Sequence, residues 1–152
     1  MKDRFETFTV QIAKISRNIR RIKTQEMQEF DLKSPHVSCI YYLYRHKATM
    51  TAKELCEVCD EDKASMSRSI DQLEKLGLIS CSSKTNKRYN SPLSLTTKGI
   101  EIGEIISSKI NNIVSIASAG ISDSEREIFY KCLLTISNNL SLFCSNTIEE
   151  DN

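Results

Sequence analysis

The sequence predicts a mainly α-helical chain that contains one small β-hairpin. Three observations lead to this fold class. Helix-breaking residues are rare, since the 152 residues include only four Gly and two Pro. Apolar residues recur every three or four positions near both ends of the chain, as in amphipathic helices. Two short segments of alternating apolar and polar residues, 78–81 and 91–95, lie on either side of a basic loop.

The first predicted helix lies within residues 1–30 and carries a single apolar seam. Its apolar positions are separated alternately by three and four residues, which is typical of a helix that pairs with another helix. These positions are Phe5, Phe8, Ile12, Ile15, Ile19 and Ile22. A second helix begins at Ser34 and Pro35, because Ser is a good N-cap and Pro suits the first turn. Its side chains expected to face the core are Val37, Ile40, Tyr41, Leu43 and Tyr44.

The third helix begins at Thr51, which forms a capping box with Glu54. Leu55 and Val58 are expected to pack inward, and Cys56 and Cys59 are further candidates for the core.

The fourth helix covers about residues 62–76. Asp60 or Asp62 is its predicted N-cap, and Gly77 ends it. Its buried stripe is predicted to consist of Met66, Ile70, Leu73 and Leu76.

Two longer helices follow the hairpin. Thr96 or Thr97 caps the fifth helix, whose apolar face comprises Ile102, Ile106, Ile110, Ile113 and Ala117. Gly120 ends this helix, and a second capping box, Ser122 with Glu125, starts the sixth. The apolar face of the sixth helix comprises Phe129, Leu133, Ile136, Leu140 and Phe143.

The charged residues are clustered, although the formal net charge is only +1. Residues 14–23 carry five basic side chains and no acidic one, and residues 81–98 carry four basic side chains and no acidic one. Acidic residues gather at 60–62 and 149–151. The total charge is therefore compatible with a basic face that binds phosphates.

The outward face of the fourth helix is predicted to contact DNA at Ser65, Ser67, Arg68 and Gln72. Small residues let a helix enter the major groove, where Arg and Gln reach base edges in bidentate geometry. A solvated helix face has the same residue types, but the basic hairpin that follows favours DNA. Lys84, Lys87 and Arg88 in its loop would contact phosphates or the minor groove. Together these elements predict a winged helix-turn-helix with N- and C-terminal dimerisation helices.

The same segments resemble the MarR family of transcriptional regulators. The resemblance is carried by residues 63–68 (KASMSR), 73–79 (LEKLGLI), 86–88 (NKR) and 93–99 (LSLTTKG), and it extends over nearly the whole chain. It implies a homodimer that binds pseudo-palindromic operator DNA, usually as a repressor released by a small molecule or an oxidant. It also implies that Ser65, Ser67 and Arg68 serve the major groove and that Arg88 is the wing arginine.

Two positions depart from the family pattern. Asn86 stands where the family usually has an Asp that orients the wing arginine, so the charge assistance of that hydrogen bond is lost. The acidic residues 60–62 favour the helix dipole but oppose a nearby phosphate. We therefore expect modest DNA affinity that depends strongly on salt.

The cysteines do not predict a metal site. Cys56 and Cys59 form a CxxC pair, but no second Cys or His pair stands at ligand spacing, so we expect neither a metal nor a cofactor. Most of the thiols are expected to be small buried hydrophobes, and a sensing role for Cys39 or Cys56 is the alternative. The family's sensing Cys lies in the first helix, where this chain has none.

The family resemblance implies an effector pocket, which would lie between the dimerisation helices and the winged domain. Its candidate residues are Arg17 (or Arg20), Tyr41, Tyr44 and Arg45. Aromatic rings with a cation suit an aromatic carboxylate or a phenol, although core packing explains the tyrosines equally well.

These observations predict a regulator with four parts: a dimerisation helix (1–30), a winged helix-turn-helix (34–99), further dimerisation helices (100–145) and an acidic, disordered tail (146–152). The alternative is a winged helix that binds an acidic protein partner without specific DNA binding. No phosphate loop or catalytic motif indicates an enzyme. No apolar run approaches the roughly 20 residues of a membrane span, so we expect a cytoplasmic protein with reduced thiols that binds no membrane.

Overall fold

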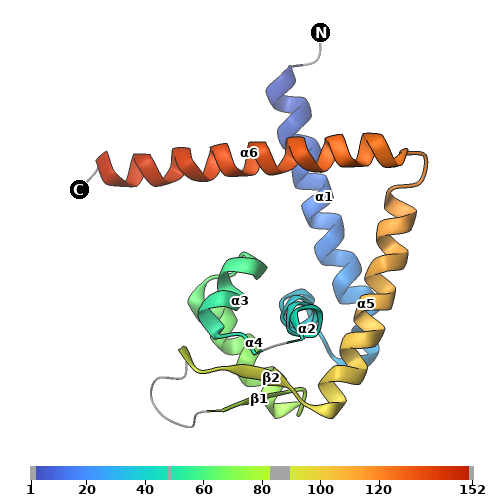
Figure 1. The fold of residues 1–152 in the computed structure, drawn as a ribbon, viewed down its shortest axis with the longest axis vertical. Helices are drawn as coiled ribbons and strands as arrows, with labels where there is room; N and C mark the ends of the chain where they lie inside the picture. The colour runs from blue at the N-terminus through green and yellow to red at the C-terminus, as the bar shows by residue number, and fades with distance from the viewer. Residues whose placement is uncertain (1–2, 48, 83–89, 151–152) are drawn as a thin grey trace. The chain divides into compact units, whose positions relative to one another are not determined.

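A computed structural model describes residues 3–47, 49–82 and 90–150, with the backbone alone for Phe5 and residues 147–150. Within these ranges the chain is mainly helical with one antiparallel hairpin, as the sequence predicts (Figure 1). The elements are α1 (Arg4–Glu26), a short 3-10 helix η1 (Gln28–Phe30), α2 (Ser34–His46), α3 (Ala52–Cys59), α4 (Lys63–Lys75), β1 (Ile79–Cys81), β2 (Leu93–Leu95), α5 (Thr97–Ala117) and α6 (Asp123–Glu150). Both strands are shorter than predicted, and α6 continues past residue 145, the predicted end of the C-terminal helices.

The chain forms two compact units, residues 1–110 and residues 111–152. The first unit contains the winged helix-turn-helix and the hydrophobic core that holds it together. The second contains the end of α5 and the whole of α6.

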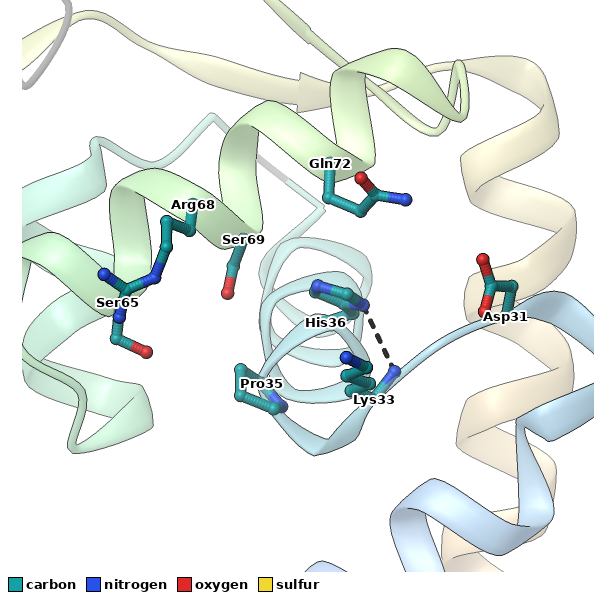
Figure 2. A pocket seen from close by; sticks show the side chains of 8 residues that line it. All are labelled: Asp31, Lys33, Pro35, His36, Ser65, Arg68, Ser69 and Gln72. Carbon is teal, nitrogen blue, oxygen red and sulfur yellow. Dashed lines mark hydrogen bonds between the residues drawn. The ribbon is translucent and has the colours of Figure 1, made fainter.

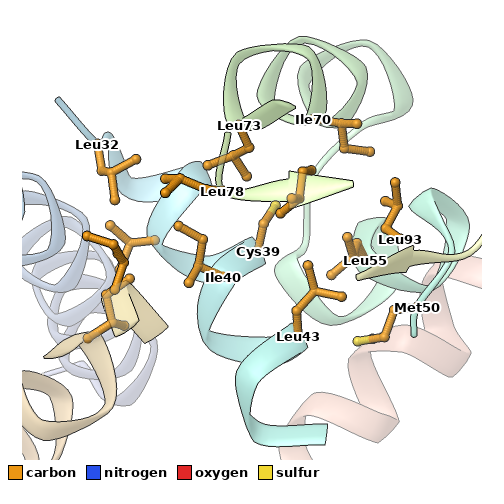
Figure 3. Packing of buried hydrophobic residues seen from close by; sticks show 14 of the residues in the cluster. Leu32, Cys39, Ile40, Leu43, Met50, Leu55, Ile70, Leu73, Leu78 and Leu93 are labelled. Carbon is orange, nitrogen blue, oxygen red and sulfur yellow. The ribbon is translucent and has the colours of Figure 1, made fainter. Parts of the chain in front are cut away.

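The core of the first unit lies where α2, α3, α4 and the hairpin meet (Figure 3). Ile40 of α2, Leu55 of α3 and Leu93 of β2 are each 0 % exposed. Met66 and Leu73 supply the buried stripe of α4, as predicted, so this helix has one fixed orientation against the core.

The predicted inward face of α3 is wrong at Val58. The side chain of Val58 is exposed, whereas Cys56 and Cys59 pack against the core beside Leu55. Val58 immediately precedes Cys59 and therefore lies about 100° around the helix from it. The inward side of α3 is therefore formed by Leu55, Cys56 and Cys59.

The hairpin has the register Ile79↔Leu95, Ser80↔Ser94 and Cys81↔Leu93. Met50, just before α3, extends this pairing, because its N–H and carbonyl exchange hydrogen bonds of 3.1 and 2.8 Å with the backbone of Leu93. The chain that enters α3 is thus tied to the hairpin.

Two of the sequence segments quoted above, 73–79 and 93–99, are joined by hydrogen bonds through Thr96. Its N–H donates to the Leu78 carbonyl over 3.0 Å and its hydroxyl donates to the Gly77 carbonyl over 2.7 Å. The same hydroxyl accepts from the Gly99 N–H (3.0 Å), which makes Thr96 the N-cap of α5. Gly99 is required because a Cβ there would overlap the Leu78 carbonyl oxygen.

The helix caps follow the sequence in four of five cases, Thr96 of α5 included. The Thr51–Glu54 and Ser122–Glu125 boxes form as predicted, and Asp62 caps α4. The prediction for α2 is wrong, since Ser34 is its first helical residue and Lys33 is the N-cap. The Lys33 N–H donates to His36 Nδ1 over 3.1 Å, so the side chain of the third helical residue binds back to the backbone of the N-cap.

Candidate nucleic-acid interface

The turn between α3 and α4 fixes where the recognition helix begins. Asp60 adopts the left-handed conformation (φ 54°), which Asp tolerates better than most residues. The Asp62 carboxylate then accepts from the Ser65 N–H over 2.8 Å. A three-residue turn and one N-cap therefore set the start of α4 relative to α3.

The predicted contact residues of α4 lie on the face opposite its buried stripe. Ser67 and Arg68 are exposed, and Ser65 and Gln72 are half-buried. The Ser65 hydroxyl already donates to a Glu61 carboxylate oxygen over 2.8 Å. Arg68 is thus an exposed cation of this face that lies next to its small residues.

A polar cavity of about 420 Å³ lies beside this face (Figure 2). Ser65, Arg68 and Gln72 line one side of it, and the chain around the start of α2 lines the other. The complete lining is Asp31, Lys33, Pro35, His36, Ser65, Arg68, Ser69 and Gln72. The cavity brings together three of the four predicted residues of α4, whereas Ser67 is not part of the lining.

Lys33 and His36 are functional candidates that the sequence reasoning missed. Their signal was the Lys-Ser-Pro-His segment, in which a ring nitrogen stands three residues after the N-cap. Only the folded chain places this segment opposite α4 (Figure 2).

The His36 ring is neutral and oriented. Burial lowers the pKa of His36, and the charge of Lys33 lowers it further, against a smaller opposing effect of Asp31. Nδ1 accepts the Lys33 N–H, so the neutral ring carries its proton on Nε2. His36 therefore offers one N–H donor near the cavity.

The predicted wing contacts, Lys84, Lys87 and Arg88, and the departure at Asn86 lie outside the described residues. The strands that lead to this loop are described as far as Ser82, whose N–H donates to the Pro92 carbonyl over 3.1 Å. Lys98, after the hairpin, donates to the Leu76 carbonyl at the end of α4 (3.2 Å), which suits the negative end of the helix dipole.

The four candidates for an effector pocket are spread over α1 and α2. Arg17 and Arg45 are exposed, and Tyr41 and Tyr44 are half-buried. Tyr44 lines a cavity of about 520 Å³ together with Leu43, Lys47, Thr49, Ser94, Leu95 and Ile100. Tyr41 packs edge-on against Tyr42, with ring centroids 5.5 Å apart.

All six cysteines are thiols in this structure. Among the described residues, no group of three or more His, Cys, Asp or Glu side chains is arranged to hold a metal ion. No helix in the described ranges is both long and apolar enough to cross a membrane.

Known proteins match this chain at two levels, a family model and the fold of solved structures. Residues 30–88 match the model of the MarR family. No curated protein matches the chain. Three solved structures are similar over most of their length and of this chain: a MarR protein from Peptoclostridium difficile (TM-score 0.80, 21% identity, 92% of this chain and 91% of that one), MepR of S. aureus in its DNA-binding conformation (0.78, 20%, 88% and 98%), and a MarR family regulator from Listeria monocytogenes in complex with a 26mer DNA (0.74, 25%, 92% and 90%).

These matches confirm the resemblance seen in the sequence. The family match covers α2, α3, α4 and β1, which are the elements that hold the candidate interface, and the fold match extends to the flanking helices. The family match is to residues 30–88, and the chain as a whole has the fold of solved MarR family transcriptional regulators.

Proposed function

We propose that this chain is a homodimeric, sequence-specific DNA-binding regulator that acts as a repressor and is released by a small-molecule or oxidant signal. The observation that carries the proposal is the outward face of α4, where Arg68 and Ser67 are exposed above a fixed buried stripe. A solved structure of the same fold, from Listeria monocytogenes, contains a 26mer DNA.

Each residue of this face has a role that its chemistry supports. Arg68 would read a guanine through two hydrogen bonds, and Gln72 would read an adenine in the same way. Ser65 and Ser67 leave room for the helix to approach the bases, and the Ser65 hydroxyl would exchange Glu61 for a DNA acceptor.

The start of α2 would hold the DNA backbone beside α4. Lys33 supplies a cation and His36 an Nε2–H donor, and both line the same cavity as Arg68. Contacts of this kind position a protein on DNA without reading the sequence. Lys84, Lys87 and Arg88 would do the same from the wing.

Dimerisation is supported by apolar faces that remain exposed. On α1 these include Phe8, Ile12, Ile15 and Ile19, and on α6 they include Phe129, Leu133, Ile136, Leu140 and Phe143. Soluble monomers rarely expose so many large apolar side chains on their helices. A two-fold dimer would bury them and set two α4 helices about one DNA turn apart.

A small-molecule signal would bind in the cavity that Tyr44 lines. The cavity that contains Tyr44 is bordered by apolar side chains and by Lys47. This lining, like the predicted set Arg17, Tyr41, Tyr44 and Arg45, suits an aromatic carboxylate or a phenol.

The decisive experiment is a selection of bound sequences from random duplex DNA, carried out at two salt concentrations. We expect an inverted repeat whose half-sites are about ten base pairs apart. We also expect the logarithm of the binding constant to fall with the logarithm of the salt concentration, by about 0.9 for each phosphate neutralised.

The alternative function, a module that binds an acidic protein partner, predicts the opposite result. The protein would then not change the electrophoretic mobility of duplex DNA even at low salt. A salt slope near zero would also contradict the proposed DNA binding. A single half-site in the selected sequences would retain DNA binding but contradict the dimer.

A further inference from the structure

Two buried polar side chains line the cavity between α4 and the start of α2. Ser69 of α4 is 4 % exposed and His36 of α2 is 9 % exposed. Among the described residues, none forms a hydrogen bond with the Ser69 hydroxyl or with Nε2 of His36, whose ring is bonded to Lys33 through Nδ1. The sequence reasoning did not select Ser69, because helical periodicity places it at the edge of the buried stripe of α4.

The two free groups come from different helices and point into the same space. In Figure 2 the Ser69 hydroxyl points toward the start of α2, and the ring nitrogen of His36 that does not bind Lys33 lies on the side toward Ser69. That nitrogen carries the proton of the neutral ring, and a hydroxyl can also donate. The cavity therefore offers two neutral hydrogen-bond donors.

The charged residues of the lining favour an anion. Lys33 and Arg68 are cations, and Asp31, the one acid of the lining, is exposed. The lining thus carries one net positive charge. A phosphodiester carries one negative charge and has two non-bridging oxygens, which matches one net positive charge and two donors. Arg68 also belongs to the outward face of α4, so an anion bound here would lie beside the side chain proposed to read a base.

We propose that this cavity is a seat for one backbone phosphate of the DNA, in which Ser69 and His36 each donate a hydrogen bond to a non-bridging oxygen. The inference rests on the proposed function and adds to it Ser69 and a division of roles. The neutral donors orient the phosphate, and Lys33 supplies the charge. A phosphate held between α2 and α4 fixes the register in which Arg68 meets the bases.

Salt titrations distinguish the neutral donors from the cation. Ser69→Ala and His36→Asn each remove one hydrogen bond to a charged group, so each should lower the affinity for the selected duplex at least about tenfold. The salt slope should not change in either variant, because a neutral donor releases no counterion. Lys33→Met keeps the backbone N–H that binds His36 but loses the charge, so it should reduce the slope by about 0.9.

Matched controls remove the same groups at exposed positions. Ser108→Ala on α5 and His46→Asn at the end of α2 should bind the duplex as the wild type does. His36→Asn retains an oxygen near the position of Nδ1, so the acceptor for the Lys33 N–H is kept while Nε2–H is lost. Urea unfolding of every variant checks that it is folded under the conditions of the titrations.

A scan of the DNA backbone locates the phosphate. Each phosphate of one half-site is replaced in turn by a methylphosphonate, which has a methyl group in place of the charged oxygen. At one position the wild type should lose at least about tenfold in affinity, as for the loss of a hydrogen bond to a charged group. Ser69→Ala and His36→Asn should lose far less at this same position, because their contact is already missing.

The ring nitrogens of histidine give a measurement on the wild type itself. The chain has two histidines, so in a ¹⁵N-labelled protein His46 is the internal reference for His36. The Nε2 signal of His36 should shift when the selected duplex is added, and it should not shift with inorganic phosphate at an equal phosphate concentration. A saturable shift with inorganic phosphate that also displaces the duplex would assign the cavity to a free anion and overturn the proposal.

The outcomes separate the phosphate seat from the proposed function. If the duplex binds but the His36 signal does not move, the seat is wrong and the function stands. The same holds if the two variants lose no affinity, or if they point to different phosphates in the scan. A wild type that binds no duplex at any salt concentration overturns the proposed function and the seat together.

Discussion

Arg68 shows how the core determines the chemistry of a surface residue. Met66 and Leu73 are fully buried, so the helical period places Arg68 on the open side of α4. The exposed side chain stays hydrated in the free protein and is available for a base edge.

Replacing Arg68 with Ala should remove sequence preference more than it removes affinity for DNA in general. A bidentate contact to guanine contributes about 1–3 kcal/mol of discrimination, so the preference for the selected duplex over a scrambled one should fall by a factor of roughly 5 to 150. Fluorescence anisotropy with both duplexes measures this ratio. Arg126→Ala is the control, because it removes the same charge from a residue paired with Asp123 on α6. Equal losses on both duplexes would assign Arg68 to the phosphates.

Arg88→Ala should have the complementary effect. If the wing arginine contacts the DNA backbone, its loss lowers the affinity for the selected and the scrambled duplex by a similar factor and reduces the salt slope by about one. Titrations of the variant at three salt concentrations check both expectations. A change of preference without a change of slope would mean that the wing reads bases.

Gly99 is the second residue whose identity the structure explains. Ala normally stabilises a helix relative to Gly by roughly 0.5–1 kcal/mol. At this position the added Cβ would overlap the Leu78 carbonyl oxygen and lie 3.2 Å from Leu95 Cδ2. We therefore expect Gly99→Ala to destabilise the protein by about 1–3 kcal/mol, as overpacking does. Urea unfolding measures the change, with Ser108→Ala on the exposed face of α5 as the control for helix propensity. A more stable Gly99→Ala variant would show that the hairpin moves aside.

At the scale of elements, the local signals in the sequence were reliable. The capping boxes at Thr51 and Ser122, the Asp62 cap and the left-handed Gly77 are contacts between residues at most a few positions apart, so a short pattern specifies them. The face of α3 was harder to predict. Leu55, Val58 and Cys59 all fit an apolar stripe in a helix of eight residues, and the packing against α2 and α4 decides between them.

The start of α2 illustrates what sequence patterns miss. Ser is usually preferred at an N-cap, but here Lys33 holds that position and its N–H donates to the ring of His36. The cavity shared by His36 and Arg68 and the contact of Cys39 Sγ with Met66 Sδ are tertiary contacts. No local spacing encodes them, whereas the residues of the α4 face could be predicted because helical periodicity alone orders them.

His36 makes the stability of α2 depend on pH. Its pKa in the folded protein is lowered, mainly by burial and also by Lys33, below the value of about 6.5 expected for the unfolded chain. The unfolded state therefore takes up the proton first as the pH falls, and the free energy of unfolding decreases below about pH 6.5. Protonation also removes the acceptor for the Lys33 N–H.

The variant His36→Asn separates this effect from other titrations. Asn keeps an oxygen acceptor near the position of Nδ1 but does not titrate. Denaturant unfolding at about pH 7.5 and about pH 5 should show a smaller decrease in stability for the variant than for the wild type. Identical pH profiles would mean that carboxylates elsewhere account for the acid sensitivity.

At the scale of the whole molecule, the exposed apolar faces of α1 and α6 are the feature that supports a dimer. Leu140 is 53 % exposed and Phe143 is 71 % exposed on α6. Burying one Leu or Phe side chain stabilises an interface by about 1.5–3 kcal/mol, so a few such residues from two chains suffice for a stable dimer. Two reading heads on one DNA then bind with a high effective concentration, which each head alone lacks.

We expect the wild type to have twice the chain mass of 17.3 kDa in solution at micromolar concentration. Leu140→Glu places a charge in the apolar face of α6, and a charge that must be buried opposes association. This variant should be monomeric and should bind the selected duplex far more weakly, while its affinity for a single half-site is unchanged. Light scattering coupled to size exclusion gives the mass, and anisotropy gives both affinities. Asn138→Glu adds the same charge at an exposed polar position of α6 and should remain dimeric. A monomeric wild type, or a dimeric Leu140→Glu variant with full affinity, would show that α6 does not join the two chains.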